Sequence, residues 1–183
     1  MNDQLKLISK TVISETSLTF SSSEIDELEV NENKTFSDSI QNLILAKLTQ
    51  KFSNKCVGNG FVIPNEMKLI RKSEIYFPHE ALQMSYKVDI EFSSLIVNPD
   101  VGSELKMKIE MTNKIGFLGT LLDSPMSPLI FLCPKDLTQS KNIFETKAVG
   151  DVVVIKVIGS KFEQNDKKIT VIAEIVDEES KDP

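Results

Sequence analysis

The residues with the clearest potential for chemistry lie in one short segment, Lys55 to Phe61, where a cysteine precedes a Gly-Asn-Gly sequence. Glycine-rich turns bind phosphate groups when a strand precedes the glycines and a helix follows them. Here a helical pattern comes before the glycines, the β-prone residues "FVI" follow, and a third glycine at the required spacing is missing. The segment is therefore predicted to be a loop and not a nucleotide-binding site.

Few other residues of the chain could carry out a reaction. The one histidine, His79, stands beside a proline without a paired cysteine or a cluster of carboxylates, so we expect a turn residue. The two cysteines, Cys56 and Cys133, are far apart and lack metal-ligand spacing. The sequence contains no nucleophile elbow, zinc-protease motif or phosphate-binding loop. We therefore expect no enzyme: no catalytic residues, no metal and no cofactor.

Composition narrows the class of protein further. A chain of 183 residues with 40% hydrophobic and 26% charged residues is typical of soluble globular proteins with one large domain or two small ones. The absence of a long apolar run and of a secretory signal leads us to expect an intracellular protein with reduced cysteines. The net charge of −6 argues against general nucleic-acid binding by the whole surface. Residues 101–177 are neutral, with 10 lysines against 10 acidic residues, so the acidity lies elsewhere.

Hydrophobic periodicity predicts a small α+β domain in residues 1–98. Residues 5–20 carry β-branched residues in partial alternation, which is typical of a strand. The segment "TFSDSIQNLILAKLTQKF" predicts an amphipathic helix with Ser37 as its N-cap. Its apolar face consists of Ile40, Leu43, Ile44, Leu48 and Phe52. After the glycines, "GFVI" and "MKLIRKSEIYF" predict strand, turn and strand, and "LQMSYKVDIEFSSLIVNP" alternates as a further strand. Together these elements predict one helix packed on an antiparallel sheet.

Residues 99–177 have a different pattern. Five short alternating segments, bounded by Gly and Pro, are separated by turns and by one longer, irregular connection from Lys135 to Val149. Five strands with the irregular connection between the third and the fourth predict a five-stranded Greek-key barrel of the oligonucleotide-binding (OB) kind. The remaining residues, 178–183, are predicted to form an acidic tail.

The amino-acid sequence of these five strands resembles that of an S1-type RNA-binding domain. The segments "VGSELKMKI", "NKIGFLGTLLD", "PLIFLCPKDL", "VGDVVVIKVIGSKF" and "KKITVIAEI" follow one another as the strands of that family do. Gly102, Gly116, Gly150 with Asp151, and Gly159 fall at the glycine positions of the family. The resemblance covers about 75 residues and implies an S1-like OB fold.

The first half extends the resemblance to the stalk subunit of multisubunit DNA-directed RNA polymerases, a family that comprises the seventh subunit of eukaryotic polymerase II and its archaeal counterpart. That family has an amphipathic helix, a glycine-rich loop and a strand before its S1 domain, as in "LILAKLTQKFSNKCVGNGFVI" and "MSYKVDIEFSSLIVNPDVGSEL". Order and spacing agree over about residues 5–177. The Lys-, Ile- and Asn-rich usage suggests an AT-rich genome, for which a large cytoplasmic DNA virus with its own polymerase would account.

The resemblance implies that the glycine-rich loop docks on the polymerase core. The implied partners are the large polymerase subunits and a smaller stalk protein, and the implied location is the nucleus or, for a virus, the host cytoplasm and virion. The implied docking residues are Lys55, Cys56, Val57, Gly58, Asn59, Gly60 and Phe61. Glycines permit the positive φ and close backbone approach that a docking tip needs. The alternative is a tight turn that leads into a strand.

The resemblance also bears on RNA binding. S1 domains that grip RNA stack bases on two aromatic residues and a histidine, and alignment places Ile115, Leu118 and Cys133 at those positions. Strand alternation puts Phe117 on the opposite face from Leu118, in the core. What remains for weak, salt-dependent contact with nascent single-stranded RNA is a set of lysines. These are Lys106, Lys108, Lys114, Lys156 and Lys161.

Two other functions stay open on the sequence. A free-standing S1-type RNA-binding module in translation or RNA decay would have the same barrel but would leave the helix and the glycine-rich loop unexplained. An OB-fold protein that binds only protein would also fit the missing aromatic patch. The polymerase hypothesis is preferred because it explains both halves of the chain.

Overall fold

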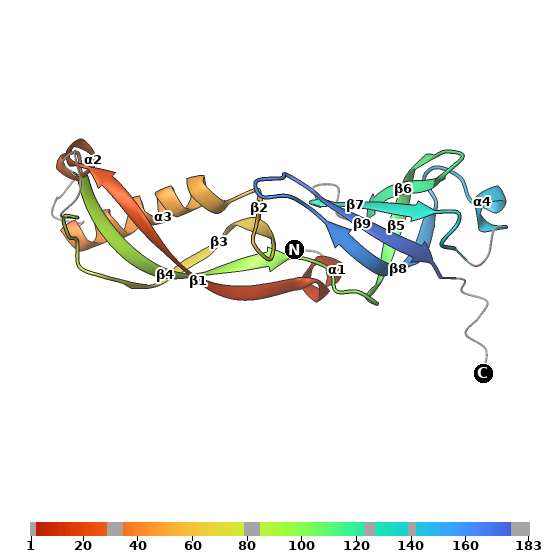
Figure 1. Cartoon of the computed structure of the whole chain (residues 1–183), viewed down its shortest axis with the longest axis horizontal. Helices are drawn as coiled ribbons and strands as arrows, with labels where there is room; N and C mark the ends of the chain where they lie inside the picture. Colours follow the sequence, from red (N-terminus) through yellow and green to blue (C-terminus); the bar gives the residue numbers. More distant parts are fainter. Residues whose placement is uncertain (1–2, 29–34, 79–84, 123–126, 139–141, 177–183) are drawn as a thin grey trace. The chain divides into compact units, whose positions relative to one another are not determined.

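The computed structural model describes residues 3–28, 35–78, 85–122, 127–138 and 142–176. The chain forms two compact units, each shown with its elements in Figure 1. The helix–sheet unit comprises Thr11–Asn54 and Val62–Leu95. The barrel unit comprises Met1–Lys10, Lys55–Phe61 and Ile96–Pro183. The sequence placed the division at residues 98 and 99, whereas two segments from the first half group with the barrel.

A four-stranded sheet supplies the strands of the helix–sheet unit, although its shortest strand groups with the barrel unit. Its strands, in the order in which they pair, are β1 (Ser9–Ser21), β4 (Ser85–Val97), β3 (Gly60–Lys72) and β2 (Cys56–Val57). The short helix α2 (Ser22–Asp26) follows β1, and the long helix α3 (Phe36–Phe52) follows α2. The sequence predicted two strands separated by a turn after the glycines, but the structure has the single continuous strand β3, which runs through Pro64 without a turn.

The core of this unit lies between α3 and the sheet. Three residues of the predicted helical face, Ile40, Ile44 and Leu48, are buried, and they pack with inward residues of two strands. Those strand residues are Leu18, Phe20, Val88, Ile90 and Phe92. The predicted stripe is thereby confirmed as core.

The N-cap of α3 differs from the prediction. Thr35 and not Ser37 is the N-cap: its Oγ1 accepts a hydrogen bond from the Asp38 amide at 3.2 Å. The Asp38 carboxylate in turn accepts one from the Thr35 amide at 3.2 Å. This reciprocal pair is a capping box, which a serine two residues further on cannot form.

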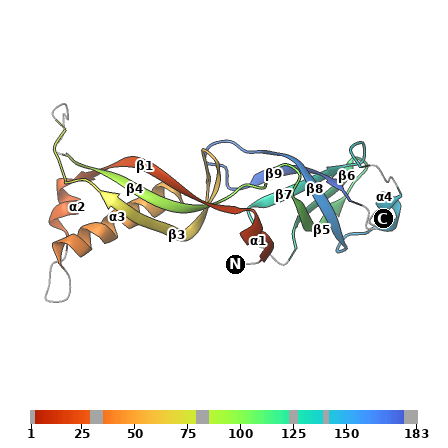
Figure 2. The same cartoon turned by 90° about the horizontal axis from the view of Figure 1, so that it is seen from below.

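The barrel unit contains a closed barrel with the strand order β5-β6-β7-β9-β8. The strands are β5 (Glu104–Thr112), β6 (Gly116–Leu121), β7 (Leu129–Pro134), β8 (Val152–Lys161) and β9 (Ile169–Ile175). All pairs are antiparallel except β7 with β9, which are parallel. Five strands closed in this order are an OB fold, so the predicted α+β class with an S1-like OB barrel is confirmed. Figure 2 shows the same strands from below.

Alternate residues of the five strands fill the barrel. Phe117 is 1% exposed, which confirms its predicted place in the core. Its ring lies 4.6 Å from that of Phe144, in the short helix α4 (Ile143–Thr146). The irregular connection from Lys135 to Val149 thus supplies a buried side chain that packs against the barrel core. A second short helix, α1 (Asp3–Leu7), belongs to the same unit, and its Gln4 Oε1 accepts a hydrogen bond from the Lys106 amide at 2.7 Å.

His79 and the tail 178–183 lie outside the described residues, so their predicted roles stay predictions. Among the described residues, no helix is long and apolar enough to cross a membrane. The same part of the chain holds no group of three or more His, Cys, Asp or Glu side chains that could bind a metal ion.

Candidate functional site

The segment Lys55–Phe61 is hydrogen-bonded to the turn between β8 and β9. The Cys56 amide donates to the Asp166 carbonyl oxygen at 2.7 Å, and the Asn165 amide donates to the Cys56 carbonyl oxygen at 2.9 Å. The Cys56 thiol also lies 3.9 Å from the Lys168 carbonyl oxygen. These contacts explain why the segment groups with the barrel and not with the helix that precedes it.

A second anchor of this segment is the side chain of Asn98. Its amide nitrogen donates to the Asn59 carbonyl oxygen at 3.0 Å, and its oxygen accepts a hydrogen bond from the Ser160 hydroxyl at 3.0 Å. Asn98 therefore links the loop to β8, because its side-chain nitrogen and oxygen each form a hydrogen bond with one of the two segments. The sequence marked this asparagine only as the end of a domain, because a side chain that bridges two distant segments leaves no periodic signal.

The two glycines of the loop have different surroundings. At Gly60 a Cβ atom would lie 2.5 Å from the Val97 carbonyl oxygen and 2.7 Å from the Ile96 side chain, so only glycine fits without a shift of the backbone. At Gly58 the backbone is left-handed, with φ of +50°, but nothing lies within 4 Å of the position of a Cβ. The backbone at Gly60 thus packs closely against Ile96 and Val97 of the same chain, and this contact needs no partner protein.

Of the seven predicted docking residues, Cys56, Gly60 and Phe61 are buried in this chain, and Lys55 and Val57 are half-buried. Only Gly58 and Asn59 are exposed. The predicted docking role stays a prediction, and the surface that the loop offers to a partner is the Gly58–Asn59 tip.

Neither cysteine has the environment of a reactive thiol. Burial, together with the nearby Asp166 carboxylate, raises the pKa of the Cys56 thiol to about 11. Burial alone raises the pKa of the Cys133 thiol to about 12. Since the thiolate is the nucleophile, both cysteines are suited to packing and not to catalysis.

The five predicted RNA-binding lysines lie on the outside of the barrel unit but do not form one group. Lys106 and Lys108 project from the same face of β5, two residues apart. Lys156 lies on the neighbouring strand β8, opposite Glu104, and its Nζ is 3.9 Å from the Glu174 carboxylate. Lys114 lies in the β5–β6 turn and Lys161 at the end of β8. The structure therefore brings three of the five lysines to the β5–β8 side and leaves the other two apart.

The alignment of Cys133 with the base-stacking patch is wrong, because a stacking residue must lie on the outer face of the barrel. Cys133 is 1% exposed and its Sγ lies 3.9 Å from the Met107 Sδ inside the barrel. The outward residue of β7 is its neighbour Leu132, which pairs with Leu118 on β6. Ile115, as aligned, is 75% exposed in the β5–β6 turn. Period-two alternation along "PLIFLCP", with Phe131 inside, is the signal that finds Leu132.

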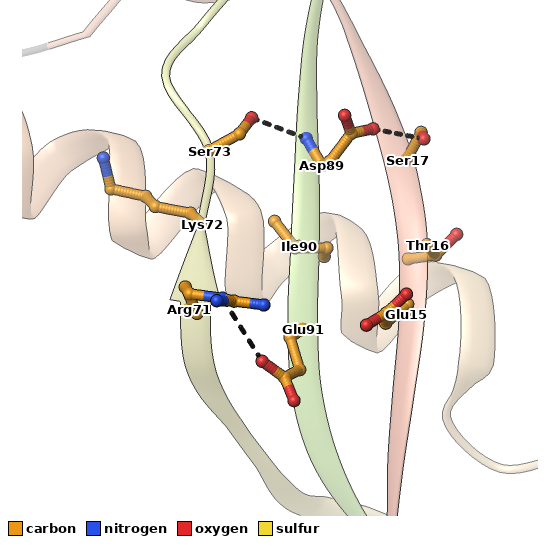
Figure 3. Close-up of a pocket in the computed structure, with 9 residues that line it drawn as sticks. All are labelled: Glu15, Thr16, Ser17, Arg71, Lys72, Ser73, Asp89, Ile90 and Glu91. Atoms are coloured by element: carbon orange, nitrogen blue, oxygen red, sulfur yellow. Dashed lines mark hydrogen bonds and ion pairs between the residues drawn. The ribbon is translucent and has the colours of Figure 1, made fainter.

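A polar hollow of about 600 Å³ lies on the helix–sheet unit, and sequence reasoning did not single it out. It is lined by Glu15, Thr16, Ser17, Arg71, Lys72, Ser73, Asp89, Ile90 and Glu91. Figure 3 shows these residues on neighbouring strands. Asp89 accepts hydrogen bonds from the hydroxyls of Ser17 at 2.5 Å and Tyr76 at 3.1 Å, and Arg71 lies 3.4 Å from Glu91. The two carboxylates are therefore engaged with side chains of the same unit.

No family model and no curated protein matches the chain. Among solved structures, the chain is similar to GSP13 from Bacillus subtilis, with 21% sequence identity and a TM-score of 0.34. The match covers 47% of this chain and 66% of GSP13, slightly less than two thirds of that protein. At this TM-score the assignment of the fold depends on the strand order of the barrel itself. The chain is thus an α+β protein with an OB barrel.

Proposed function

We propose that the chain is a non-catalytic stalk subunit of a DNA-directed RNA polymerase, which docks on the polymerase core and holds its OB barrel near the emerging transcript. The observation that carries the proposal is one chain with a helix–sheet unit, a glycine-rich loop after the helix and an OB barrel, in that order. The resemblance to the stalk family predicts this order. A free-standing S1-type module in translation or RNA decay needs the barrel alone.

The proposed partners are the large polymerase subunits, with a smaller stalk protein as a further one. The proposed docking point is the exposed Gly58–Asn59 tip, and the other residues of the loop support that tip. Hydrogen bonds from Asn98 and to Asp166 hold the loop in place before any partner binds. A preformed tip loses little conformational entropy on docking, which favours affinity.

The proposed RNA contact is weak and lies along Lys106, Lys108 and Lys156. Glu104 and Glu174 lie beside Lys156, so the local positive charge is diluted. Because the aromatic residues of the barrel strands, Phe117 and Phe131, are buried, binding depends on phosphate contacts and is lost as salt rises. We expect micromolar or weaker affinity for single-stranded RNA near physiological salt, without sequence preference.

The proposal is tested by affinity purification of the tagged chain from its own cells, followed by mass spectrometry. We expect the large polymerase subunits, and we expect Asn59→Trp to reduce their recovery because it adds bulk at the exposed tip. The matched control is Glu66→Trp, an exposed position outside the loop, which should leave recovery unchanged. Recovery of ribosomal or RNA-decay proteins without polymerase would support the alternative function.

The RNA contact needs a separate test. The titration of labelled oligouridylate, followed by fluorescence anisotropy at several salt concentrations, gives the affinity and its salt dependence. We expect Lys106→Glu with Lys108→Glu to weaken binding, whereas Lys68→Glu on β3 should not. Tight binding that persists at high salt would contradict the proposed mode of contact.

A further inference from the structure

A row of aliphatic side chains crosses four neighbouring strands on the outside of the barrel. Met111 pairs with Leu118, Leu118 with Leu132, and Leu132 with Ile172, so β5, β6, β7 and β9 each contribute one residue. Met111 is 55% exposed, Leu132 37% and Ile172 38%. We call these four residues the aliphatic row. Ile115, three residues before Leu118 in the chain, is a further exposed aliphatic residue in the β5–β6 turn.

The aliphatic row has the wrong chemistry for nucleic acid. The aromatic residues of the same strands, Phe117 and Phe131, are 1% and 0% exposed and point into the barrel. Base stacking needs an aromatic or guanidinium plane, and the row supplies neither. Exposed aliphatic side chains in contiguous register are instead typical of a surface that another protein covers.

The charges at the ends of the row are positive. Lys114 precedes Ile115, Lys108 pairs with Thr120 beside the row on β6, and Lys161 pairs with Thr170 beside it on β9. Within the described residues none of these three lysines forms an ion pair. Glu174 lies 3.9 Å from Lys156. Glu110 accepts a hydrogen bond from the Thr120 hydroxyl at 3.1 Å and keeps its negative charge, so the three lysines outnumber this one acid beside the row. A partner that carries acidic residues beside its aliphatic ones would complement this surface.

The geometry of the row restricts the shape of the partner. The strands that carry the row are paired on both sides in a closed barrel, so no free edge is available for an added strand. Adjacent strands lie about 4.8 Å apart, so the row spans about 14 Å along the surface. A helix presents one side chain of a stripe about every 5.4 Å, and between two and three turns match that length. A helix that lies across the strands fits the row.

We propose that the aliphatic row is a docking site for an amphipathic helix of another protein, with a stripe of Leu or Ile side chains flanked by Asp and Glu. The site uses neither the Gly58–Asn59 tip nor Lys106 and Lys156, and it shares only Lys108 with the proposed RNA contact. Helix-in-groove recognition of this kind takes its affinity from the aliphatic stripe and its selectivity from the flanking charges.

The test is a selection of peptides on the intact chain. The library holds peptides of about four helical turns, with aliphatic residues at helical spacing and the other positions randomised among Asp, Glu, Lys and Ser. We expect the selected peptides to be rich in Asp and Glu. They should bind about tenfold more weakly to the variant Leu132→Thr with Ile172→Thr, which places a β-branched residue of good strand propensity at both positions.

Matched variants and NMR keep the result interpretable. The control is Ile13→Thr with Ile70→Thr, two exposed aliphatic residues of the helix–sheet unit, which should bind the peptides as the unmodified chain does. Methyl resonances of Met111, Leu118, Leu132 and Ile172 should shift on addition of peptide, which tests the site without any substitution. The proposal is overturned if the selection yields no pattern or a lysine-rich one. It is equally overturned if oligouridylate shifts those methyl groups, or if the free chain dimerises through them.

Discussion

The loop glycines provide the sharpest test of how this chain is held together. Asparagine tolerates left-handed backbone better than other non-glycine residues, so Gly58→Asn is compatible with φ of +50° and open surroundings. The same substitution at Gly60 places a Cβ atom 2.5 Å from the Val97 carbonyl oxygen at φ of +153°. One amino acid introduced at two neighbouring sites thus separates close approach from a simple turn.

The magnitudes follow from the two environments. Forcing extra atoms into a packed site costs about 1–3 kcal/mol, and a strained backbone adds about 1–3 kcal/mol, so Gly60→Asn should lose about 3 kcal/mol or more. Each 1 kcal/mol lowers Tm by about 2–4 °C in a chain of this size, which amounts to about 6–12 °C. Gly58→Asn should cost less than about 1 kcal/mol, or a few degrees at most.

Thermal unfolding followed by circular dichroism, with urea unfolding as a second measure, determines both values. Equal Tm values for the two variants would refute the close approach at Gly60. The comparison also bears on assays of docking: a Gly60 variant that fails to bind polymerase has an altered fold, so only changes at the exposed Gly58–Asn59 tip report on docking.

Three further outcomes are expected. Thr35→Ala should destabilise the chain by about 0.5–2 kcal/mol in urea, because it removes the cap of α3, and Ser37→Ala should cost less. Cys56 and Cys133 should react with a thiol reagent at pH 8 only after unfolding, because both are buried. Burial raises both pKa values above 9.0 in the folded state. The stabilising contribution of the protonated thiols is therefore present below pH 9.0 and is lost as pH rises through about 11 for Cys56 and about 12 for Cys133. A fragment Pro99–Pro183 should give a β-rich circular dichroism spectrum with a lower Tm than the whole chain; a coil spectrum would show that the barrel needs its two added segments.

The sequence predicted those parts of the fold that depend on local periodicity. The helix over Phe36–Phe52 and the five barrel strands were found because apolar residues recur along each of them at one fixed spacing. The barrel order also follows, since an irregular connection between the third and fourth strands is typical of OB folds. Periodicity cannot show whether two adjacent apolar segments form one strand or two, so β3 was divided in error.

The candidate site depends on contacts between distant residues, and these were beyond the sequence. Nothing in the order of residues along the chain indicates that Cys56 pairs with Asn165 and Asp166, or that Asn98 joins two segments. The error at Cys133 has a different cause, because a shift of one residue in a strand exchanges the inner and outer faces. The burial of Phe131 fixes the inner face of β7 and thereby places Leu132 on the outside.

The position of the loop has a consequence for any partner that binds it. Because Lys55–Phe61 belongs to the barrel unit, a protein that binds the folded Gly58–Asn59 tip and not the unfolded chain must stabilise the barrel unit as well. At a partner concentration about 100 times the Kd, the stabilisation amounts to about 2.7 kcal/mol. Hydrogen exchange of the Cys56 and Asn165 amides, which both take part in the pairing of loop and turn, would then slow on binding. A partner that docked on the helix–sheet unit instead would leave the exchange of these two amides unchanged, so their exchange rates distinguish docking at the tip from docking on the other unit.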